Sequence, residues 1–337
     1  GIFFTIAGIA SARWILGIMN TPEDIMDSAM TYIRVYYMGL IPLMLYDMGT
    51  SILRAIGDSR RPLYFLIASA VTNILLDLLL VAVIPMGVAG AALATVLSNV
   101  VSSALFILLL LKKSQNLSLR PRDVGVQGGE LREILTIGLP ASITNLTQSF
   151  AMTLTNRFLL PYGTEQVAAL GIALKVNMIV MLIMVGFAFG AQPLLGYNYG
   201  AGDRERLRGI LRFDVLVELC FSLVMTVIFL VGAPWIIRCF MQDPAVVQAG
   251  GSILRCMVVT MPLMGVILVC TTLFQAAGKA MPAFLLSISR QGVALLVCMV
   301  ILSAAFGRWG VLLAQAVADV VSVILALVLL RRSKIFH

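Results

Sequence analysis

Residues 87–111 read GVAGAALATVLSNVVSSALFILLLL, an apolar stretch that contains no charged side chain. An α-helix needs about 20 predominantly apolar residues to cross the hydrocarbon core of a bilayer, and this stretch is long enough. It lacks the alternation of polar and apolar residues that a strand of a transmembrane barrel would show. Because backbone polar groups in hydrocarbon must be paired within the segment, we predict a membrane-spanning helix here.

Stretches of the same kind recur along all 337 residues of the chain. Apolar residues make up 60% of the sequence and charged residues 12%, whereas a soluble domain has about half and about a quarter. The chain is therefore predicted to be an all-α polytopic membrane protein with ten visible transmembrane helices. They are expected near residues 1–19, 25–53, 61–84, 87–111, 131–160, 166–199, 209–238, 245–276, 281–304 and 309–330.

Basic residues gather in alternate loops between these segments. The richer loops follow the second, fourth, sixth, eighth and tenth segments and hold Arg54, Arg60, Arg61, Lys112, Lys113, Arg120, Arg122, Arg132, Arg204, Arg206, Arg208, Arg212, Lys279, Arg331, Arg332 and Lys334. Because cytoplasmic loops carry the excess of Lys and Arg, we predict a multi-pass protein of the bacterial cytoplasmic (inner) membrane with its C-terminus in the cytoplasm. The same distribution accounts for the net charge of +8 without nucleic acid as a partner.

The residues that usually carry catalysis or bind metals are scarce. The only histidine is His337, and the five cysteines form no CxxC pair, so we interpret the cysteines as small apolar core residues. An integral-membrane enzyme would need a cluster of His and acidic residues, and a passive channel would need a filter motif or rings of like charge. Neither is visible, and no cofactor is expected.

The chain resembles itself at an offset of about 220 residues. Trp14 matches Trp235, and further matches in the same order are Pro22 with Pro244, Arg34 with Arg255, Pro42 with Pro262, Gly57 with Gly278, Pro62 with Pro282 and Gly90 with Gly310. Matched segments share one orientation, which predicts a parallel repeat about an axis along the membrane normal. Residues 1–112 are then an N-terminal lobe, 113–130 a cytoplasmic linker and 131–332 a C-terminal lobe.

Residues 131–199 have no counterpart in the first lobe. We therefore expect two further helices ahead of Gly1 and an intact protein of twelve helices, arranged as six plus six. The alternative is a protein that has ten helices in all.

Five motifs, in order along nearly the whole chain, carry a resemblance to a known family. Residues 190–208, GAQPLLGYNYGAGDRERLR, resemble the signature of the multidrug and toxic compound extrusion (MATE) transporters. The other four are ILRAIGDSRRP at 52–62, GVAGAALAT at 87–95, GLP at 138–140 and FQAAGK at 274–279. The pattern is most similar to the DinF-like and MepA-like branches, and it implies an N-terminally truncated member.

The resemblance implies a two-lobed secondary antiporter that is likewise not an enzyme. Such a protein exports small organic cations or amphipathic compounds in exchange for Na⁺ or H⁺ by alternating access, within membrane lipid and as a monomer. The alternative inside the same wider superfamily is a lipid-linked oligosaccharide flippase. Flippases tend to have strongly cationic cavities, whereas Lys and Arg are few inside the apolar segments here.

A set of oxygen-bearing side chains in the first lobe is the candidate coupling site. Asn73 and Asp77 are four residues apart and so share a helix face, and Thr95 lies at a similar depth on the next segment. Hard cations prefer oxygen ligands, and a desolvated carboxylate can instead hold a proton. The resemblance implies a cation site at Asn73, Asp77 and Thr95, with Asp47 where the family often has Asn. No other metal site is expected, and structural hydrogen bonding between helices is the alternative role.

Four residues of the second lobe are candidates for the substrate cavity: Gln148, Lys175, Asn177 and Met178. Gln148 stands where the NorM-like branch of the family carries Glu, which argues against the cation site of that branch in this lobe. Lys175 either faces the cavity or extends outward to the interface. Flexible methionines suit a promiscuous apolar cavity.

Two acids near the start of the seventh segment, Asp214 and Glu218, lie one helical turn apart. We expect them to pair with the arginines at 204–212. Asp319 and Asn99 are repeat mates whose role is structural or functional.

Overall fold

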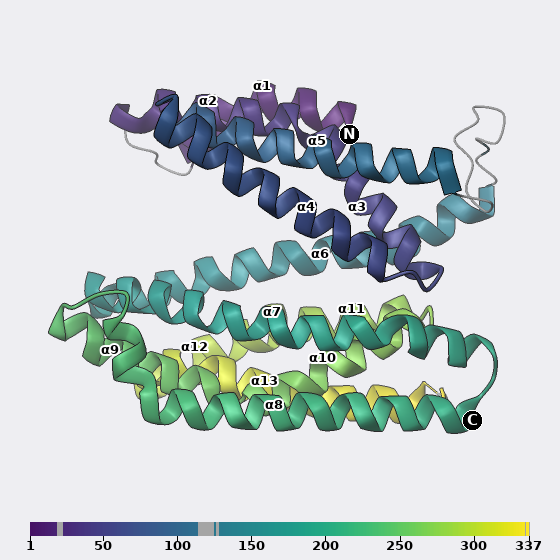
Figure 1. Cartoon of the computed structure of the whole chain (residues 1–337). Helices are drawn as coiled ribbons and strands as arrows, with labels where there is room; N and C mark the ends of the chain where they lie inside the picture. The colour runs from purple at the N-terminus through teal and green to yellow at the C-terminus, as the bar shows by residue number, and fades with distance from the viewer. Residues whose placement is uncertain (19–22, 114–124, 126–127, 334, 337) are drawn as a thin grey trace. The chain divides into compact units, whose positions relative to one another are not determined.

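The computed structural model describes residues 1–18, 23–113, 125, 128–333 and 335–336, and the regular elements among them are helices. The chain divides into two compact units, Gly1–Gly125 (unit 1) and Val126–His337 (unit 2). The boundary falls within the predicted linker 113–130, of which residues 114–124 and 126–127 lie outside the described residues. The helical fold class predicted from the sequence is confirmed (Figure 1).

Unit 1 contains helices α1 (Ile2–Ile18), α2 (Glu23–Met38), α3 (Leu40–Ala55), α4 (Arg60–Asp77), the π-helical turn η1 (Leu78–Val83) and α5 (Gly87–Lys113). Helix α5 packs against α2, α3 and α4, and α1 packs against α2. Helix α5 is therefore the common neighbour around which unit 1 is built.

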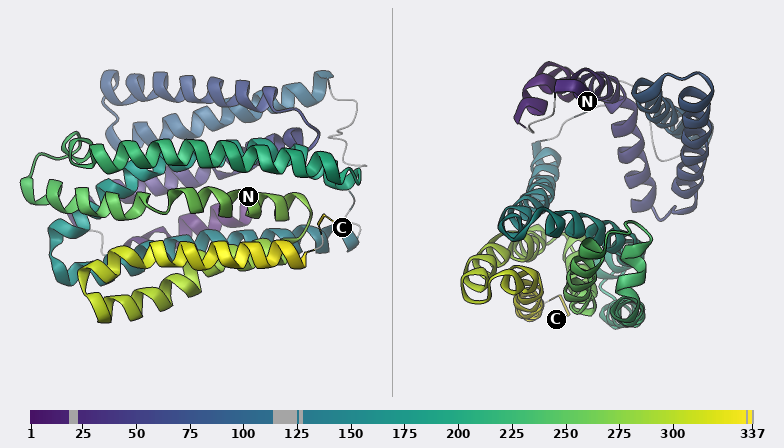
Figure 2. Two further views of the ribbon diagram at one scale, coloured as in Figure 1. Left: turned by 90° about the horizontal axis from the view of Figure 1, so that it is seen from below. Right: turned by 90° about the vertical axis from the view of Figure 1, so that its left-hand side faces the viewer.

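Unit 2 contains α6 (Gly128–Leu159), η3 (Leu160–Tyr162), α7 (Thr164–Gly200), α8 (Arg204–Arg238), α9 (Pro244–Val258), α10 (Met261–Ala276), α11 (Ala280–Ile288), η4 (Ser289–Val293), α12 (Ala294–Phe306) and α13 (Arg308–Arg332). Its long helices run side by side along one direction, which the right-hand view of Figure 2 looks down. Helices α7, α8 and α10 pack against one another, α12 packs against α13, and α6 packs against α11.

Several predicted segments are interrupted. The segment 25–53 is broken at Gly39 into α2 and α3, where a Cβ on Gly39 would collide with Val96 of α5. The segment 245–276 bends by 47° between α9 and α10. The segment 281–304 passes through the π-helical turn η4 between α11 and α12.

Six described helices are long and apolar enough to cross a membrane, or seven if the bent pair α9 and α10 is one span. Helix α1 is shorter, and the breaks divide other segments. The predicted count of ten spans is not confirmed by this measure. The surface fits a lipid environment, because large apolar side chains such as Val231, Phe3 and Trp235 are more than two-thirds exposed.

The turns at Gly57 and Gly278 have the same conformation, as their matched positions in the repeat predict. Each glycine has a positive φ, +85° and +69°. In the first turn Asp58 N–H donates to Leu53 O and Gly57 N–H to Arg54 O, and in the second Lys279 N–H donates to Phe274 O and Gly278 N–H to Gln275 O. This pair of bonds is the Schellman motif, which pairs the last carbonyls of a helix and favours glycine at its left-handed position.

The motif at 190–208 contains a helix end and a helix start. Gly202, with φ +74°, follows the end of α7. Asp203 then caps α8 by accepting the backbone N–H of Arg206 at 3.0 Å. Glycine and aspartate are suited to these two positions, so the motif forms a tight connection between long helices.

Unit 2 has two apolar cores. The larger contains Leu159, Met184, Ile237, Leu254 and other residues of α6–α9, α12 and α13. The smaller contains Leu195, Leu207, Leu273, Phe274 and Leu286 near the other end of the helices. The cysteines are free, and only Cys270 is buried. The prediction that all five are core residues is wrong for Cys220 and Cys239, which are exposed.

Gly90 and Gly310, another matched pair, allow two helices to approach closely. A Cβ on Gly90 would lie 2.8 Å from Leu80 O, and a Cβ on Gly310 would collide with the backbone carbonyl of Leu302. These glycines let α5 and α13 pack against the backbone of the preceding helical segment.

Replacing Gly310 by alanine is therefore expected to lower the free energy of unfolding by about 1–3 kcal/mol, because the α12–α13 backbones must separate. Thermal unfolding in detergent measures the effect. The control is Gly171→Ala, because a Cβ there has no neighbour within 4 Å and alanine is the better helix former. Equal stability of both variants would contradict the close approach.

Candidate functional site

The predicted coupling residues of unit 1 lie on helices that pack together. Asn73 and Asp77 are half-buried on α4, and Thr95 is half-buried on α5. Asn73 Nδ2 and Asp77 Oδ1 are buried atoms without a hydrogen-bond partner. Buried polar atoms are nearly always paired, so these two, a donor and an acceptor one turn apart on the same helix, are exceptions.

The other two predicted coupling residues, Thr95 and Asp47, differ from Asn73 and Asp77 in hydrogen bonding and exposure. The Thr95 hydroxyl donates to Ala91 O of its own helix at 3.1 Å, which leaves its oxygen lone pairs free to accept or coordinate. Asp47 is exposed on α3, and its backbone carbonyl accepts from Ser51 at 2.8 Å. Among the described residues no hydrogen bond joins the four side chains.

Asp77 is also the last residue before a local irregularity. The chain continues from α4 into the π-helical turn η1. Short π-helical turns occur frequently at functional sites because they shift the register of side chains.

Unit 2 contains a cavity of about 590 Å³ between α6, α7, α10, α11 and η4. Its lining is mixed, with apolar side chains, hydroxyls and amides. The lining residues are Gln148, Met181, Val185, Phe189, Gln192, Met264, Ile267, Leu268, Thr271, Thr272, Gln275, Gly278, Ala280, Ala283, Phe284, Ser287, Arg290 and Gln291. Cavities of this size hold small organic ligands, with apolar walls and a few polar groups that orient them.

Four glutamines from four elements supply much of the polarity of the cavity. They are Gln148 on α6, Gln192 on α7, Gln275 on α10 and Gln291 on η4. Gln192 Nε2 donates to Gln275 Oε1 at 3.4 Å, a long and weak bond. Because each amide both donates and accepts, this set can adapt to ligands with either kind of group.

Among the described residues that line the cavity, the one charged side chain is Arg290, and it is paired with a buried carboxylate. Arg290 Nε lies 2.7 Å from Asp319 Oδ1, and the Asp319 side chain is 4% exposed. Asp319 also accepts hydrogen bonds from Thr260 at 2.9 Å and from Gln315 at 3.0 Å. The pair is therefore well satisfied, and it leaves the cavity lining close to electrically neutral.

Of the four substrate residues predicted from the sequence, Gln148 lines this cavity. Lys175 and Met178 are exposed on α7 and Asn177 is half-buried, and none of the three lines it. The sequence reasoning did not select Arg290, Gln192 or Gln275. A usable signal was present, because Arg290 and Asp319 are ionisable residues within predicted spans and such residues are functional candidates by default.

The expected pairing of Asp214 and Glu218 with the arginines at 204–212 is wrong. Asp214 is 5% exposed and Glu218 is fully buried, and Asp214 Oδ2 and both Glu218 carboxylate oxygens have no partner. Arg204 instead stacks on Tyr199 and Arg208 on Phe336. The reason is helical geometry, since the acids lie on the face of α8 that packs inward and the arginines lie on exposed turns at its start.

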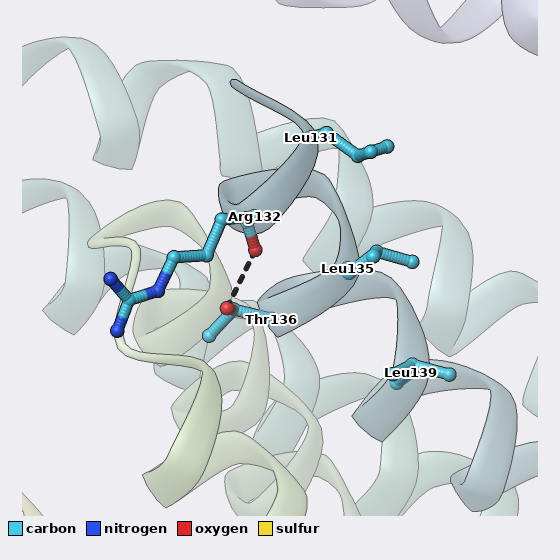
Figure 3. Close-up of a pocket in the computed structure, with 5 residues that line it drawn as sticks. All are labelled: Leu131, Arg132, Leu135, Thr136 and Leu139. Atoms are coloured by element: carbon cyan, nitrogen blue, oxygen red, sulfur yellow. Dashed lines mark hydrogen bonds between the residues drawn. The ribbon is translucent and has the colours of Figure 1, made fainter. Parts of the chain in front are cut away.

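A second, more open hollow of about 350 Å³ lies on α6. Figure 3 shows Leu131, Leu135 and Leu139 on one side of the helix and Arg132 on the other. Thr136 donates to Arg132 O at 2.7 Å, a bond within the helix. All five lining residues come from one helix, and the hollow lacks converging polar groups, so the cavity between α6, α7 and α10 is the stronger candidate.

Apolar membrane-length helices, a mixed cavity and few but buried ionisable groups together define a multi-pass membrane transport protein. Comparison with known proteins gives the family. A family model described as MatE matches residues 1–79 and 140–300, and the chain belongs to this family. Its members are transporters, so the protein is not an enzyme.

Curated relatives carry the name "Multidrug export protein MepA". The one from Staphylococcus saprophyticus is 26% identical over 330 residues, which is 98% of this chain and 72% of the relative. One from Staphylococcus aureus is 26% identical over 320 residues, or 95% of this chain and 70% of the relative. The predicted resemblance to the MepA-like branch is confirmed.

Solved structures of MATE and related transporters have the same fold as this chain. One described as the outward-facing conformation of a multidrug resistance MATE family transporter has a TM-score of 0.92 at 25% identity, covering 100% of this chain and 76% of its own. Another, from Pyrococcus furiosus, is described as a transporter whose binding pocket has reverse polarity, which suggests a different function for it. It has a TM-score of 0.91 at 25% identity, covering 99% of this chain and 75% of its own.

The Arg290–Asp319 pair leads to a prediction about stability. Replacing Arg290 by methionine leaves Asp319 buried without its cationic partner, so the free energy of unfolding should fall by about 3–5 kcal/mol. Thermal unfolding of Arg290→Met, Asp319→Leu and the double variant forms a double-mutant cycle. The double variant should be more stable than Arg290→Met. Strictly additive losses would show that the pair does not interact.

Proposed function

We propose that this protein is a secondary antiporter that exports cationic or amphipathic organic compounds in exchange for Na⁺ or H⁺ by alternating access. The MepA relatives named as multidrug export proteins support the export of several compounds. The observation that carries the proposal is the cavity of unit 2, whose walls combine apolar side chains with adaptable amides.

The cavity lining suits varied cargo. Met181 and Met264 are flexible and polarizable, and Phe189 and Phe284 offer flat apolar surfaces. Such surfaces repack around different ligands, which is the property that promiscuous binding requires. Because Asp319 neutralises Arg290, the cavity does not strongly repel an organic cation.

The coupling ion is proposed to bind at Asp77, Asn73 and Thr95, with Asp47 on the neighbouring α3. The unpaired Asp77 Oδ1 supports a site there, whereas the unpaired Asn73 atom is the amide nitrogen, which donates and does not bind a cation. Carboxylate, amide and hydroxyl oxygens suit Na⁺, and the same carboxylate can take up a proton instead. We propose no other metal ion and no cofactor for this protein.

The alternative, a lipid-linked oligosaccharide flippase, is less favoured. Its cargo would call for a strongly cationic cavity, whereas the described lining residues include one arginine, and that arginine is paired with Asp319. The proposed setting is the bacterial inner membrane, with the C-terminus in the cytoplasm and the protein as a monomer.

Transport measurements in membrane vesicles test the proposed antiport. In everted vesicles containing the protein as its gene encodes it, ethidium movement should depend on an imposed proton or sodium gradient. Asp77→Asn should abolish this dependence, because the amide cannot carry the charge that the ion neutralises. Asp27→Asn, an exposed aspartate on α2, is the matched control and should transport normally. Unchanged gradient dependence in Asp77→Asn would eliminate Asp77 as the coupling residue.

The role of the cavity is tested separately. Gln275→Leu removes one amide, so apparent affinity for compounds that bond to it should fall about two- to tenfold, equivalent to about 0.5–1.5 kcal/mol. Competition of unlabelled compounds against ethidium efflux measures this loss. Gln248→Leu, on the exposed face of α9, is the control. A uniform loss of transport in both variants would point to damaged folding instead.

A further inference from the structure

Helix α8 carries a line of polar residues on its buried face. Asp214, Glu218, Ser222 and Thr226 follow one another at intervals of four residues, and all four are buried. Residues four apart lie one above the other on a helix. Ser222 and Thr226 donate to carbonyl oxygens, Leu219 O at 3.1 Å and Val258 O at 3.0 Å. The two acids at the start of the line have no such bonds.

Glu218 is enclosed by α7 and α10. Gly265 of α10 lies beside it, since a Cβ there would be 3.4 Å from Glu218 Oε2 and 3.2 Å from the Met184 methyl group. The backbone of Ala188 on α7 faces the carboxylate, yet neither Glu218 oxygen has a partner of normal hydrogen-bond geometry. The side chain is fully buried, and its neighbours Met184 and Gly265 are apolar.

No described basic side chain forms an ion pair with either acid. The elements packed against α8 are α7, α9 and α10. Their charged or titratable residues are Glu165, Lys175, Tyr197 and Tyr199 on α7, Arg255 and Cys256 on α9, and Cys270 on α10. Glu165 and Lys175 are exposed, Tyr199 stacks with Arg204, and Arg255 donates to Leu230 O. Of the arginines at the start of α8, Arg204 and Arg208 stack on aromatic rings, and Arg206 and Arg212 are exposed.

Two adjacent carboxylates without counter-charges cannot both be ionised in such surroundings at reasonable cost. An isolated charge moved into an apolar interior is so unfavourable that the group is neutralised instead. When two carboxyl groups share a site, repulsion between their negative charges also favours the binding of one proton. A sodium ion would need several more oxygen ligands than the apolar neighbours Met184 and Gly265 provide.

We propose that Asp214 and Glu218 form a proton-binding site in unit 2, distinct from Asp77, and that at least one proton is bound when the helices pack as they do here. The ligand is a proton taken from water onto a carboxylate oxygen, forming one O–H bond. Release returns the proton to water and leaves a carboxylate that must then be hydrated.

The position of the site connects it with the cavity. Met181 and Phe189 of α7 and Met264 of α10 line the cavity, while their neighbours Met184, Ala188 and Gly265 surround Glu218. Loss of the proton would favour entry of water between α8 and the pair α7 and α10, which form the cavity wall. Proton release and cavity shape are thereby linked. This link to transport rests on the proposed function, whereas the presence of the bound proton does not.

Infrared spectroscopy of the protein in lipid vesicles tests the bound proton directly. A protonated carboxyl group has its own C=O stretching band, which shifts when H₂O is exchanged for D₂O. At neutral pH the wild type should show this band, and Glu218→Gln should lose part of it. Asp214→Asn, which keeps Glu218, is the second variant. The matched control is Glu205→Gln, an exposed glutamate on the same helix, which should leave the band unchanged.

The possible results distinguish a failure of the proton site from a failure of the proposed antiport function. A wild type without the band, or the same band in both Glu218→Gln and Asp214→Asn, overturns the proton site whatever transport shows. Thermal stabilisation by Na⁺ that is lost in Glu218→Gln would assign the acids to a cation site and also overturn it. Loss of the band in Glu218→Gln supports the site even if ethidium is not transported, a result that would count only against the proposed function.

Discussion

A charge inside an apolar helical bundle must be paired or carry a proton, and this constraint organises the polar chemistry of unit 2. Asp319 satisfies it with Arg290, Thr260 and Gln315. Asp214 and Glu218 have no cation, so protonation is the means left to them. The two solutions have different consequences, because a paired ion keeps its charge throughout a transport cycle whereas a proton can leave.

The cavity follows from the same constraint. Arg290 reaches it while its charge is balanced by Asp319 behind it, so the lining gains donors without a net field. Amides and hydroxyls supply the remaining polarity. In the proposed exporter such a lining would bind any one compound weakly, because no unbalanced buried charge anchors it, and it would accept many compounds for the same reason.

The sequence predicted the helical fold well because lipid leaves few alternatives for a long apolar segment. It also located the turns, since Gly57 and Gly278 are needed at positive φ and therefore mark their sites directly. The breaks at Gly39, at η4 and between α9 and α10 were not predicted, because apolar composition is the same in a straight helix and a bent one. Asp214 and Glu218 were misassigned because charge alone suggested the nearby arginines, whereas the burial of their helix face depends on α7 and α10. Gln148 was found by its place in a family pattern, whereas Gln192 and Gln275 lie inside the motifs 190–208 and 274–279 but were not selected, because a motif does not show which of its side chains face a cavity.

The unpredicted breaks coincide with the polar residues of unit 2. The π-helical turn η4 contains Arg290 and Gln291, and the bend between α9 and α10 contains Thr260, which donates to Asp319. A straight α-helix would turn these side chains by a different angle, since an inserted residue shifts the face on which later residues lie. The irregular turns therefore place Arg290 and Thr260 against Asp319, and these contacts link the turn η4 and the α9–α10 bend to α13.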